Sequence, residues 1–220
     1  GGTMRYYIGI VVLTILGLWI NAYHGKGVLH MMQLEGYKND QFFRWLKANW
    51  RRAFIPNVKK GEVKKPLVMT DRASRLFSTL VGLDAVFMAL FITLFILVTG
   101  RPINYRGLLL GLFIFSAILY VAQPLVLMLA NLMMAPVEKN INDGFFRAAQ
   151  KKLRFQKNTR VVGITGSFGK TSTKFITNSI LEGKFKSRTT PSSYNTPMGV
   201  SKVINENLEV DDEVFVVEMG

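Results

Sequence analysis

Three long apolar runs dominate the pattern of hydrophobic and polar positions in the first two thirds of the chain. Residues 6–23 hold no charged side chain over 18 positions, residues 76–100 hold only Asp84 over 25, and residues 107–135 hold none over 29. A buried core helix is usually shorter and carries a polar face, which these runs lack. A helix rising about 1.5 Å per residue crosses the hydrocarbon core with roughly 20 apolar residues. We therefore predict a membrane-spanning helix over 4–23 and a transmembrane helical hairpin over 76–135.

Two residues inside these runs interrupt the apolar pattern. Pro124 predicts a kink, because proline removes a backbone donor and clashes with the preceding turn. Asp84 is an ionisable residue in a span, which by default is a candidate for function. It follows the start of its run by only eight positions, however. We therefore expect a structural role near the cytoplasmic headgroups, where Arg72 and Arg75 can pair with it.

The polar segments between the runs predict which side they face. Residues 24–75 carry 12 Lys and Arg against 4 acids, and residues 136–160 carry 7 against 2, whereas the connection 101–106 carries two Arg. By the positive-inside rule, the basic loop 24–75 and everything after 136 lie in the cytoplasm, and the N-terminus lies outside. We interpret 136–159 as a basic linker. Residues 1–3 precede the first Met and are typical of a cloning remnant, so they are left out.

A cleaved signal peptide is the alternative for the first run. No small-x-small cleavage site follows it, and cleavage would leave the later spans to be inserted in any case.

The basic loop contains a candidate interfacial helix. Asn39 or Asp40 can cap a helix that begins at Gln41, and Pro56 ends it. Aromatic and apolar residues recur at spacings of three and four, with basic residues beside them: Phe42, Phe43, Trp45, Leu46, Trp50, Ala53 and Phe54, flanked by Arg44, Lys47, Arg51 and Arg52. Such a helix lies in the membrane interface. Lys59, Lys60, Lys64 and Lys65 add attraction to anionic lipid. The alternative is packing on a soluble domain.

Composition narrows the class of protein. The 220 residues carry a formal charge of +14, 49% hydrophobic residues and no Cys. This excludes a disordered basic tail and a disulfide-stapled module. Residues 1–160 hold 22 basic and 7 acidic residues, whereas 161–220 hold 6 and 7. Residues 1–160 are thus both the more basic and the more apolar part of the chain. This combination favours a lipid bilayer over a nucleic acid as the partner.

From Arg160 the pattern changes to that of a phosphate site. Residues 160–165 read as a short buried strand, and a helix follows through about Leu181, with Phe175, Ile176, Ile180 and Leu181 as its apolar residues. Between them lies the candidate nucleotide-binding turn Thr165, Gly166, Ser167, Phe168, Gly169, Lys170, Thr171 and Ser172. Glycines let backbone amides approach phosphate oxygens, and the helix N-terminus adds partial positive charge. Lys170 can reach the β- and γ-phosphates and Thr171 can ligate Mg²⁺, although Ile164 replaces the first Gly of the general P-loop pattern.

A second strand supports this interpretation. Residues 213–220 read as a buried strand of a parallel sheet that ends in an acid, Glu218. Ligands gather at the carboxyl ends of such strands. We therefore predict that Glu218 holds the metal, directly or through water; an acid that merely ends a strand is the alternative.

These residues resemble the Mur ligase family in three pieces: 165–172, 190–200 and 216–220. The family's own P-loop is shortened in the same way as here. The middle piece is most similar to the branch that adds D-alanyl-D-alanine to the UDP-muramoyl tripeptide, although only Asn195 remains of that branch's Asn pair. The resemblance covers just over a quarter of the chain. Together with the three apolar runs, it indicates a membrane anchor of three α-helical spans followed by an incomplete α/β P-loop domain, 160–220, with a parallel sheet.

The resemblance implies a mechanism and its components. ATP would phosphorylate a substrate carboxylate to an acyl phosphate, and an amine would then attack it, with Lys170, Mg²⁺ and Glu218 neutralising charge. Asn195 and Thr196 would lie near the nucleotide or acceptor. The partners would be a UDP- or lipid-linked cell-wall peptide precursor and an amino acid or dipeptide amine, at the cytoplasmic face of a bacterial membrane.

The family's UDP-sugar-binding domain is replaced here by membrane spans, which suggests a lipid-linked acceptor. The chain stops within the ATP-binding domain, so we expect it to be inactive as it stands. Three alternatives stay open. They are a ligase similar to poly-γ-glutamate synthases, a P-loop ATPase or transporter subunit, and a non-catalytic membrane scaffold.

Overall fold

The computed structural model describes residues 2–51, 66–100, 102–191 and 194–220. The chain divides into two compact units, residues 1–135 and 136–220, which are described separately. The first unit is helical, and the second combines helices with a small sheet.

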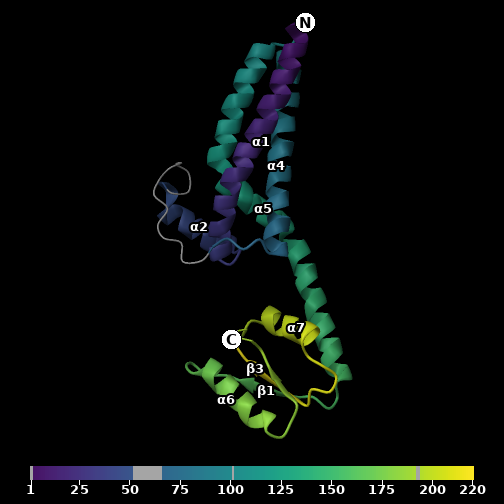
Figure 1. Ribbon diagram of the computed structural model, residues 1–220. Helices are drawn as coiled ribbons and strands as arrows, with labels where there is room; N and C mark the ends of the chain where they lie inside the picture. Colours follow the sequence, from purple (N-terminus) through teal and green to yellow (C-terminus); the bar gives the residue numbers. More distant parts are fainter. Residues whose placement is uncertain (1, 52–65, 101, 192–193) are drawn as a thin grey trace. The chain divides into compact units, whose positions relative to one another are not determined.

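Long helices make up the first unit (Figure 1). α1 spans Gly2–Leu34, α4 spans Asp71–Thr99, and α5 begins at Tyr105 and continues to Phe155 in the second unit. Within the described residues, these three helices are long and apolar enough to cross a membrane. The three expected apolar helices are thus present, and crossing itself is taken up under Proposed function.

Apolar side chains cover the outside of this unit as well as its core. Leu97 and Val98 near the end of α4 are 72% and 85% exposed, and Trp19 on α1 is 67% exposed. A water-soluble protein rarely exposes apolar surface over a whole bundle, whereas helices in lipid do so throughout. The core between the helices includes Leu29, Met32, Leu80, Met88 and Leu112.

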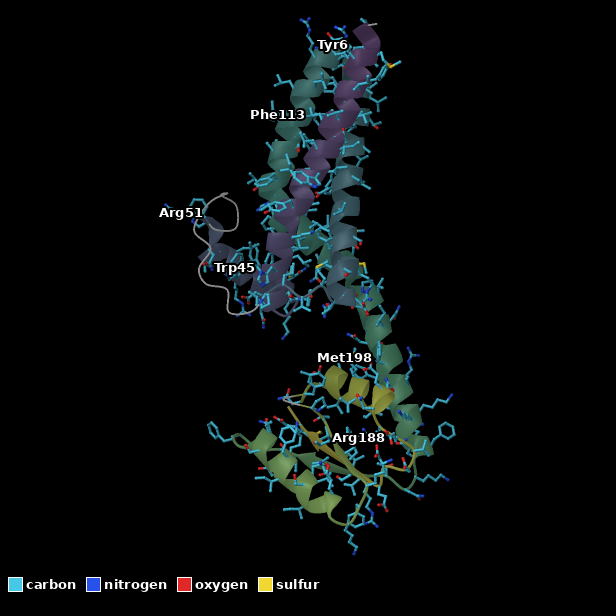
Figure 2. The ribbon with its side chains drawn as sticks, viewed as in Figure 1. Tyr6, Trp45, Arg51, Phe113, Arg188 and Met198 are labelled. Carbon is cyan, nitrogen blue, oxygen red and sulfur yellow. The ribbon has the colours of Figure 1, made fainter. Side chains whose placement is uncertain are left out.

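Aromatic side chains mark both ends of the first unit. Tyr6 stacks on Tyr105 with ring centroids 5.3 Å apart, and Trp45 belongs to α2, Asn39–Ala48. Figure 2 shows Tyr6 and Trp45 at opposite ends of the unit. This is the distribution expected of aromatic belts at two membrane surfaces.

α1 is longer than the predicted span. Residues 24–34, expected at the start of the polar loop, continue the helix to Leu34. His24 explains part of this, because its ring stacks on Tyr120 at 4.1 Å and its Nδ1 lies 3.0 Å from the Tyr120 carbonyl oxygen. Contacts with α5 therefore hold this polar stretch in the helix.

The predicted cap of α2 is wrong. The helix begins at Asn39, the cap position is Lys38, and no side-chain cap is present there. The Asn39 side chain instead donates to the Met128 carbonyl oxygen at 3.2 Å and accepts from Asn131 Nδ2 at 2.8 Å. Because α5 takes up its amide, Asn39 ties α2 to α5.

α2 divides its aromatic residues between two environments. Phe42 and Leu46 are buried in the helical core and Trp45 packs against it, whereas Phe43 is 42% exposed and Trp50, two residues after α2 ends, is 54% exposed. One side of α2 therefore packs on the unit, and the other side is left for the proposed interface. The expected contributions of Arg52, Ala53, Phe54, Pro56, Lys59, Lys60, Lys64 and Lys65 lie outside the described residues.

The observed α5 bears on two expectations, the kink at Pro124 and the basic linker after residue 135. The helix assignment runs through Pro124 without interruption, because neighbouring helices can compensate for one lost backbone donor, and the kink there stays a prediction. Residues 136–155, expected as part of a linker, are also helical. They belong to the second unit, where Ala149 and Leu153 pack against its core.

Asp84 does not lie near the start of its helix. It is the fourteenth of the 29 residues of α4, so Arg72 and Arg75 are roughly 18 and 14 Å away along the helix axis. Its Oδ2 accepts from Gln123 Nε2 at 2.8 Å. The expected pairing with these arginines is therefore wrong, because nine and twelve residues of continuous helix separate Arg75 and Arg72 from Asp84.

The second unit contains a three-stranded parallel sheet in the order β1-β3-β2. β1 spans Arg160–Ile164, β2 Ser187–Thr189 and β3 Val214–Glu218. Helix α6, Lys170–Glu182, follows β1, and α7, Pro197–Glu206, follows β2. The predicted parallel sheet is confirmed.

β3 is the central strand, and its side chains alternate between the two faces of the sheet. Phe215 and Val217 pack with Val203 and Ile204 of α7, whereas Glu218 meets residues of α6 on the other face (Figure 1). All five residues of β3 are buried. β1, expected to be buried, is an edge strand instead, and Val161 is 52% exposed.

Candidate functional site

All three strands of the sheet end at one edge, and each end leads into a predicted site segment. Ile164 ends β1 in register with Glu218 of β3. Thr189 ends β2 in register with Val216, two residues before Glu218. The turn 165–169 follows β1, and the stretch from Thr190 to Thr196 follows β2. In parallel sheets this carboxyl edge is where ligands bind.

The turn after β1 has the backbone that a phosphate cradle needs. Gly169 has φ 73° and lies at the N-cap of α6, and Gly166 has φ 152°. No acidic residue lies in the first turn of α6, and no side chain caps it among the described residues. The first amides of a helix have no acceptor within the helix, so these donors fit an anion.

The remaining residues of the turn line its outer side. Lys170 Nζ donates to the Gly166 carbonyl oxygen at 2.8 Å, which holds the side chain over the turn. Phe168 is 97% exposed. Thr165, Ser167 and Ser172 are also exposed. The whole predicted turn is therefore open to a ligand.

Glu218 brings two predicted site residues together. Its carboxylate is 3% exposed, its Oε2 accepts from Thr171 Oγ1 at 2.8 Å, and Asn195 Nδ2 lies 3.5 Å from Oε1. A hydroxyl and a carboxylate in contact are ligands suited to Mg²⁺. The donor set thus fits a magnesium ion between Thr171 and Glu218.

Thr196 lies apart from this group. Its Oγ1 accepts from the Gly199 amide at 3.2 Å and caps α7, which has Pro197 in its first turn. Asn195 is held by its backbone, because its carbonyl oxygen accepts from the Gly220 amide at 3.1 Å. Ser192 and Ser193, part of the same predicted stretch, lie outside the described residues.

Lys174 is a site residue that the sequence reading missed. Its side chain is fully buried, with Nζ 3.9 Å from Glu218 Oε2 and 3.3 Å from Thr190 Oγ1. Burial lowers the Lys174 pKa, and the nearby Glu218 carboxylate opposes that shift. Its spacing is the signal that could have found it, because it lies one helical turn after Lys170 and Thr171.

The predicted apolar side of α6 is not the buried one. Ile176 and Ile180 are 61% and 73% exposed, whereas Lys174 and Asn178 are buried. Asn178 Oδ1 accepts from Ser187 Oγ of β2 at 2.8 Å. Polar contacts with the sheet edge therefore decide how α6 is turned.

Comparison with known families agrees with this arrangement. Residues 164–220 match the family model of the Mur ligase middle domain. No solved structure matches the chain. The family match covers about a quarter of the chain and contains the turn, Lys174, Asn195 and Glu218. It supports a Mur-ligase-like, ATP-dependent ligase in general, in a family that generally uses ATP and Mg²⁺.

Proposed function

We propose that the chain is a membrane-anchored, ATP-dependent carbon–nitrogen ligase of the Mur type that acts on cell-wall precursors. The observation that carries the proposal is the match of 164–220 to the Mur ligase middle domain. The contact between Thr171 and the buried Glu218 beside an uncapped helix start supports it. Backbone geometry, ligand chemistry and family match point to the same segment.

The proposed reaction joins a carboxylate to an amine in two steps. A carboxylate oxygen of the acceptor takes the γ-phosphoryl group of ATP, and ADP leaves. The amine nitrogen then attacks the acyl carbon, phosphate leaves, and the amine loses a proton. The phosphoryl group carries spread negative charge, so the protein acts by positioning and charge neutralisation.

Each site residue has a part in this proposal. The amides of 166–172 and Lys170 would bind the phosphates, and Thr171 and Glu218 would hold Mg²⁺, which would supply positive charge to the phosphates. Lys174, which donates to Thr190, lies beside the Glu218 carboxylate and would hold it in place. Asn195 lies beside the same carboxylate and faces the acceptor or nucleotide.

The test of the nucleotide site is equilibrium binding of Mg-ATP to the chain in detergent. Lys170→Ala should weaken binding about 10- to 100-fold, because a charge-assisted contact to phosphate is lost. Lys202→Ala, an exposed lysine on α7, is the matched control and should leave binding unchanged. Equal loss in both variants, or binding by neither them nor the wild type, would contradict the proposal.

We further propose that α1, α4 and α5 anchor the ligase in the cytoplasmic membrane of a bacterium. The apolar outer surface, the aromatic ends and the basic segments 24–75 and 136–160 support this, with the ATP-binding segment in the cytoplasm. An anchor at the bilayer favours a lipid-linked acceptor over a UDP-linked one. The amine partner is an amino acid or dipeptide, as in the dipeptide-adding branch that the residues 190–200 resemble.

Two other functions use the same P-loop. A poly-γ-glutamate-synthase-like ligase would extend a glutamate polymer, and an ATPase or transporter subunit would release phosphate without an acceptor. The native protein purified from its own membranes separates them. We expect phosphate release that depends on both an amine and a lipid-linked peptide acceptor. Release that depends on neither would favour the transporter, and release with glutamate alone would favour the polymer synthase.

A further inference from the structure

Three polar side chains are buried between the apolar helices of the first unit. Asn21 of α1 and Gln123 of α5 are fully buried, and Asp84 of α4 is 1% exposed. Each comes from a different helix. Such groups are costly in an apolar bundle unless their hydrogen bonds are satisfied.

The hydrogen bonds satisfy only part of this cluster. Gln123 Nε2 donates to Asp84 Oδ2 at 2.8 Å. Within the described residues, Asp84 Oδ1, Gln123 Oε1 and both polar atoms of the Asn21 side chain have no hydrogen-bond partner. These are four of the six such buried side-chain atoms in the described part of the chain. Polar atoms without partners are therefore concentrated at one point of the bundle.

Two glycines of α1 fix how this helix meets α4. A Cβ added to Gly17 would lie 3.0 Å from Met88 Cε, and one added to Gly25 would lie 2.7 Å from Leu80 Cδ2. The helices are thus antiparallel and in close contact at both levels. A larger residue at either position would force these side chains to move, and at Gly17 also Ser116 of α5, whose Oγ would lie 2.6 Å from the added Cβ.

Asn21 lies one helical turn from each glycine, and Asp84 lies midway between Leu80 and Met88 on α4. The two residues therefore occupy the same level of the α1–α4 contact. Gln123 joins them from α5, since its Oε1 would lie 3.2 Å from a Cβ on Gly25. Asn21, whose side-chain amide has no hydrogen-bond partner among the described residues, therefore lies at the level of the Asp84–Gln123 pair.

We propose that Asn21, Asp84 and Gln123 bind one monovalent metal cation. The cluster offers one carboxylate oxygen and two amide oxygens without hydrogen-bond partners, which are the ligand atoms that hard cations take. One carboxylate gives the site a single negative charge, which one monovalent ion neutralises. A divalent ion would leave a net positive charge in an apolar bundle. The proposal goes beyond the ligase reaction and does not depend on it.

The experiment is thermal unfolding of the full chain in a nonionic detergent at pH 7.5 and constant ionic strength. Choline chloride is replaced in turn by the chlorides of Li⁺, Na⁺ and K⁺. At least one of them should raise the Tm, by about 5 °C at a concentration of about 100 times its Kd. Equal Tm values in all four salts would overturn the proposal and leave a helix-packing network with a neutral Asp84.

Two variants test the assignment to this cluster. Asp84→Asn keeps the shape but removes the charge, so it should abolish the dependence on the cation and raise the Tm in choline chloride above that of the wild type. Asp40→Asn removes an exposed carboxylate on α2 and should keep the wild-type dependence. A cation effect that persists in Asp84→Asn would overturn the proposal. Mg-ATP binding, measured in parallel, reports on the ligase site separately.

Discussion

At the residue scale, Gly169 shows how one backbone angle supports the nucleotide site. Its φ of 73° lies in the left-handed region, and a Cβ there would meet no atom within 4 Å. Conformation rather than crowding therefore requires glycine. The angle turns the chain from the strand end into the first turn of α6.

Gly169→Ala should destabilise the chain by about 1–2 kcal/mol, because an L-residue in the left-handed region costs that much. Gly144→Ala is the matched control. Gly144 lies inside α5, again with space for a Cβ, so alanine should be neutral or stabilising there. Thermal unfolding in detergent measures both. Equal stability of the two variants would show that the turn does not need its glycine.

Thr171 offers a second test at this scale, because its hydroxyl is the atom proposed to meet both Glu218 and Mg²⁺. Thr171→Val keeps the shape and removes the hydroxyl, so the affinity for Mg-ATP should fall about tenfold or more. Thr171→Ser keeps the hydroxyl and should bind nearly as the wild type does. ATP binding without Mg²⁺ should change little in either variant. A valine variant with unchanged Mg²⁺ dependence would remove Thr171 from the metal site.

At the element scale, the order strand, turn, helix was predictable, and the rotation of the helix was not. The glycines and Lys170 mark the turn from sequence alone, and α6 ends one residue from the expected Leu181. The buried side of α6, however, is set by tertiary contacts of Lys174 and Asn178 with residues 16 and 9 positions away. Hydrophobic periodicity cannot report such polar contacts.

The length of α1 and the level of Asp84 have a related explanation. A run of apolar residues measures how much helix lies in lipid, but helices continue beyond it when polar residues find partners. His24 stacks on Tyr120, and α4 begins at Asp71, directly after Thr70, whose side chain caps the helix by accepting from the Ala73 amide. Thr70 can be recognised as a helix cap in the sequence. A helix predicted to start after Thr70 would have placed Asp84 near its middle.

β2 is held to the turn before β3 by ion pairs. Lys186 Nζ lies 2.6 Å from Asp211 and 2.7 Å from Glu209, and Arg188 contacts Asp212. Hydrogen bonds to Asp211 and Glu209 raise the Lys186 pKa to about 12. The hydrogen bond from Lys186 lowers the pKa of both carboxyls. Lys186, Asp211 and Glu209 are therefore all charged at neutral pH.

The signs of these shifts predict a pH dependence. A raised Lys186 pKa contributes stability below its ordinary pKa of 10.5, which is lost as the pH rises through about 12. Lowered carboxyl pKa values contribute stability above the ordinary 4.5 of Glu209 and 3.8 of Asp211, which is lost as the pH falls further. Lys186→Met should thus lower the Tm at pH 7, and the gap to the wild type should narrow as the pH falls from 7 to 3.

Lys202→Met is the control for that measurement. Lys202 is an exposed lysine whose contact with Glu206 is 4.0 Å, so its removal should shift the Tm little at either pH. A gap for Lys186→Met that stayed the same at pH 3 would assign the effect to lost packing of the lysine stem rather than to charge.

At the scale of the whole molecule, charge and apolar surface are distributed differently between the helical unit and the segment that carries the proposed chemistry. The helical unit carries the apolar outer surface, and the proposed chemistry lies in the last 60 residues, where 6 basic and 7 acidic residues nearly balance. The basic excess belongs to the segments that flank the spans. The proposed bilayer would give this distribution a single physical cause, because basic residues tend to stay on the cytoplasmic side of membrane spans.

This reading predicts which parts of the chain an impermeant reagent can reach. The 220 residues contain no Cys, so single cysteines introduced into them report their own position. Pro102→Cys, in the exposed connection between α4 and α5, should react with a membrane-impermeant maleimide on intact spheroplasts. Asn158→Cys, in the exposed turn before β1, should react only after permeabilisation. Because both positions are exposed within their own units, a difference in labelling reports the side of the membrane. The opposite pattern would reverse the orientation and put the ATP site outside the cell, where ATP is scarce, while equal labelling of both in intact spheroplasts would contradict the three-span anchor.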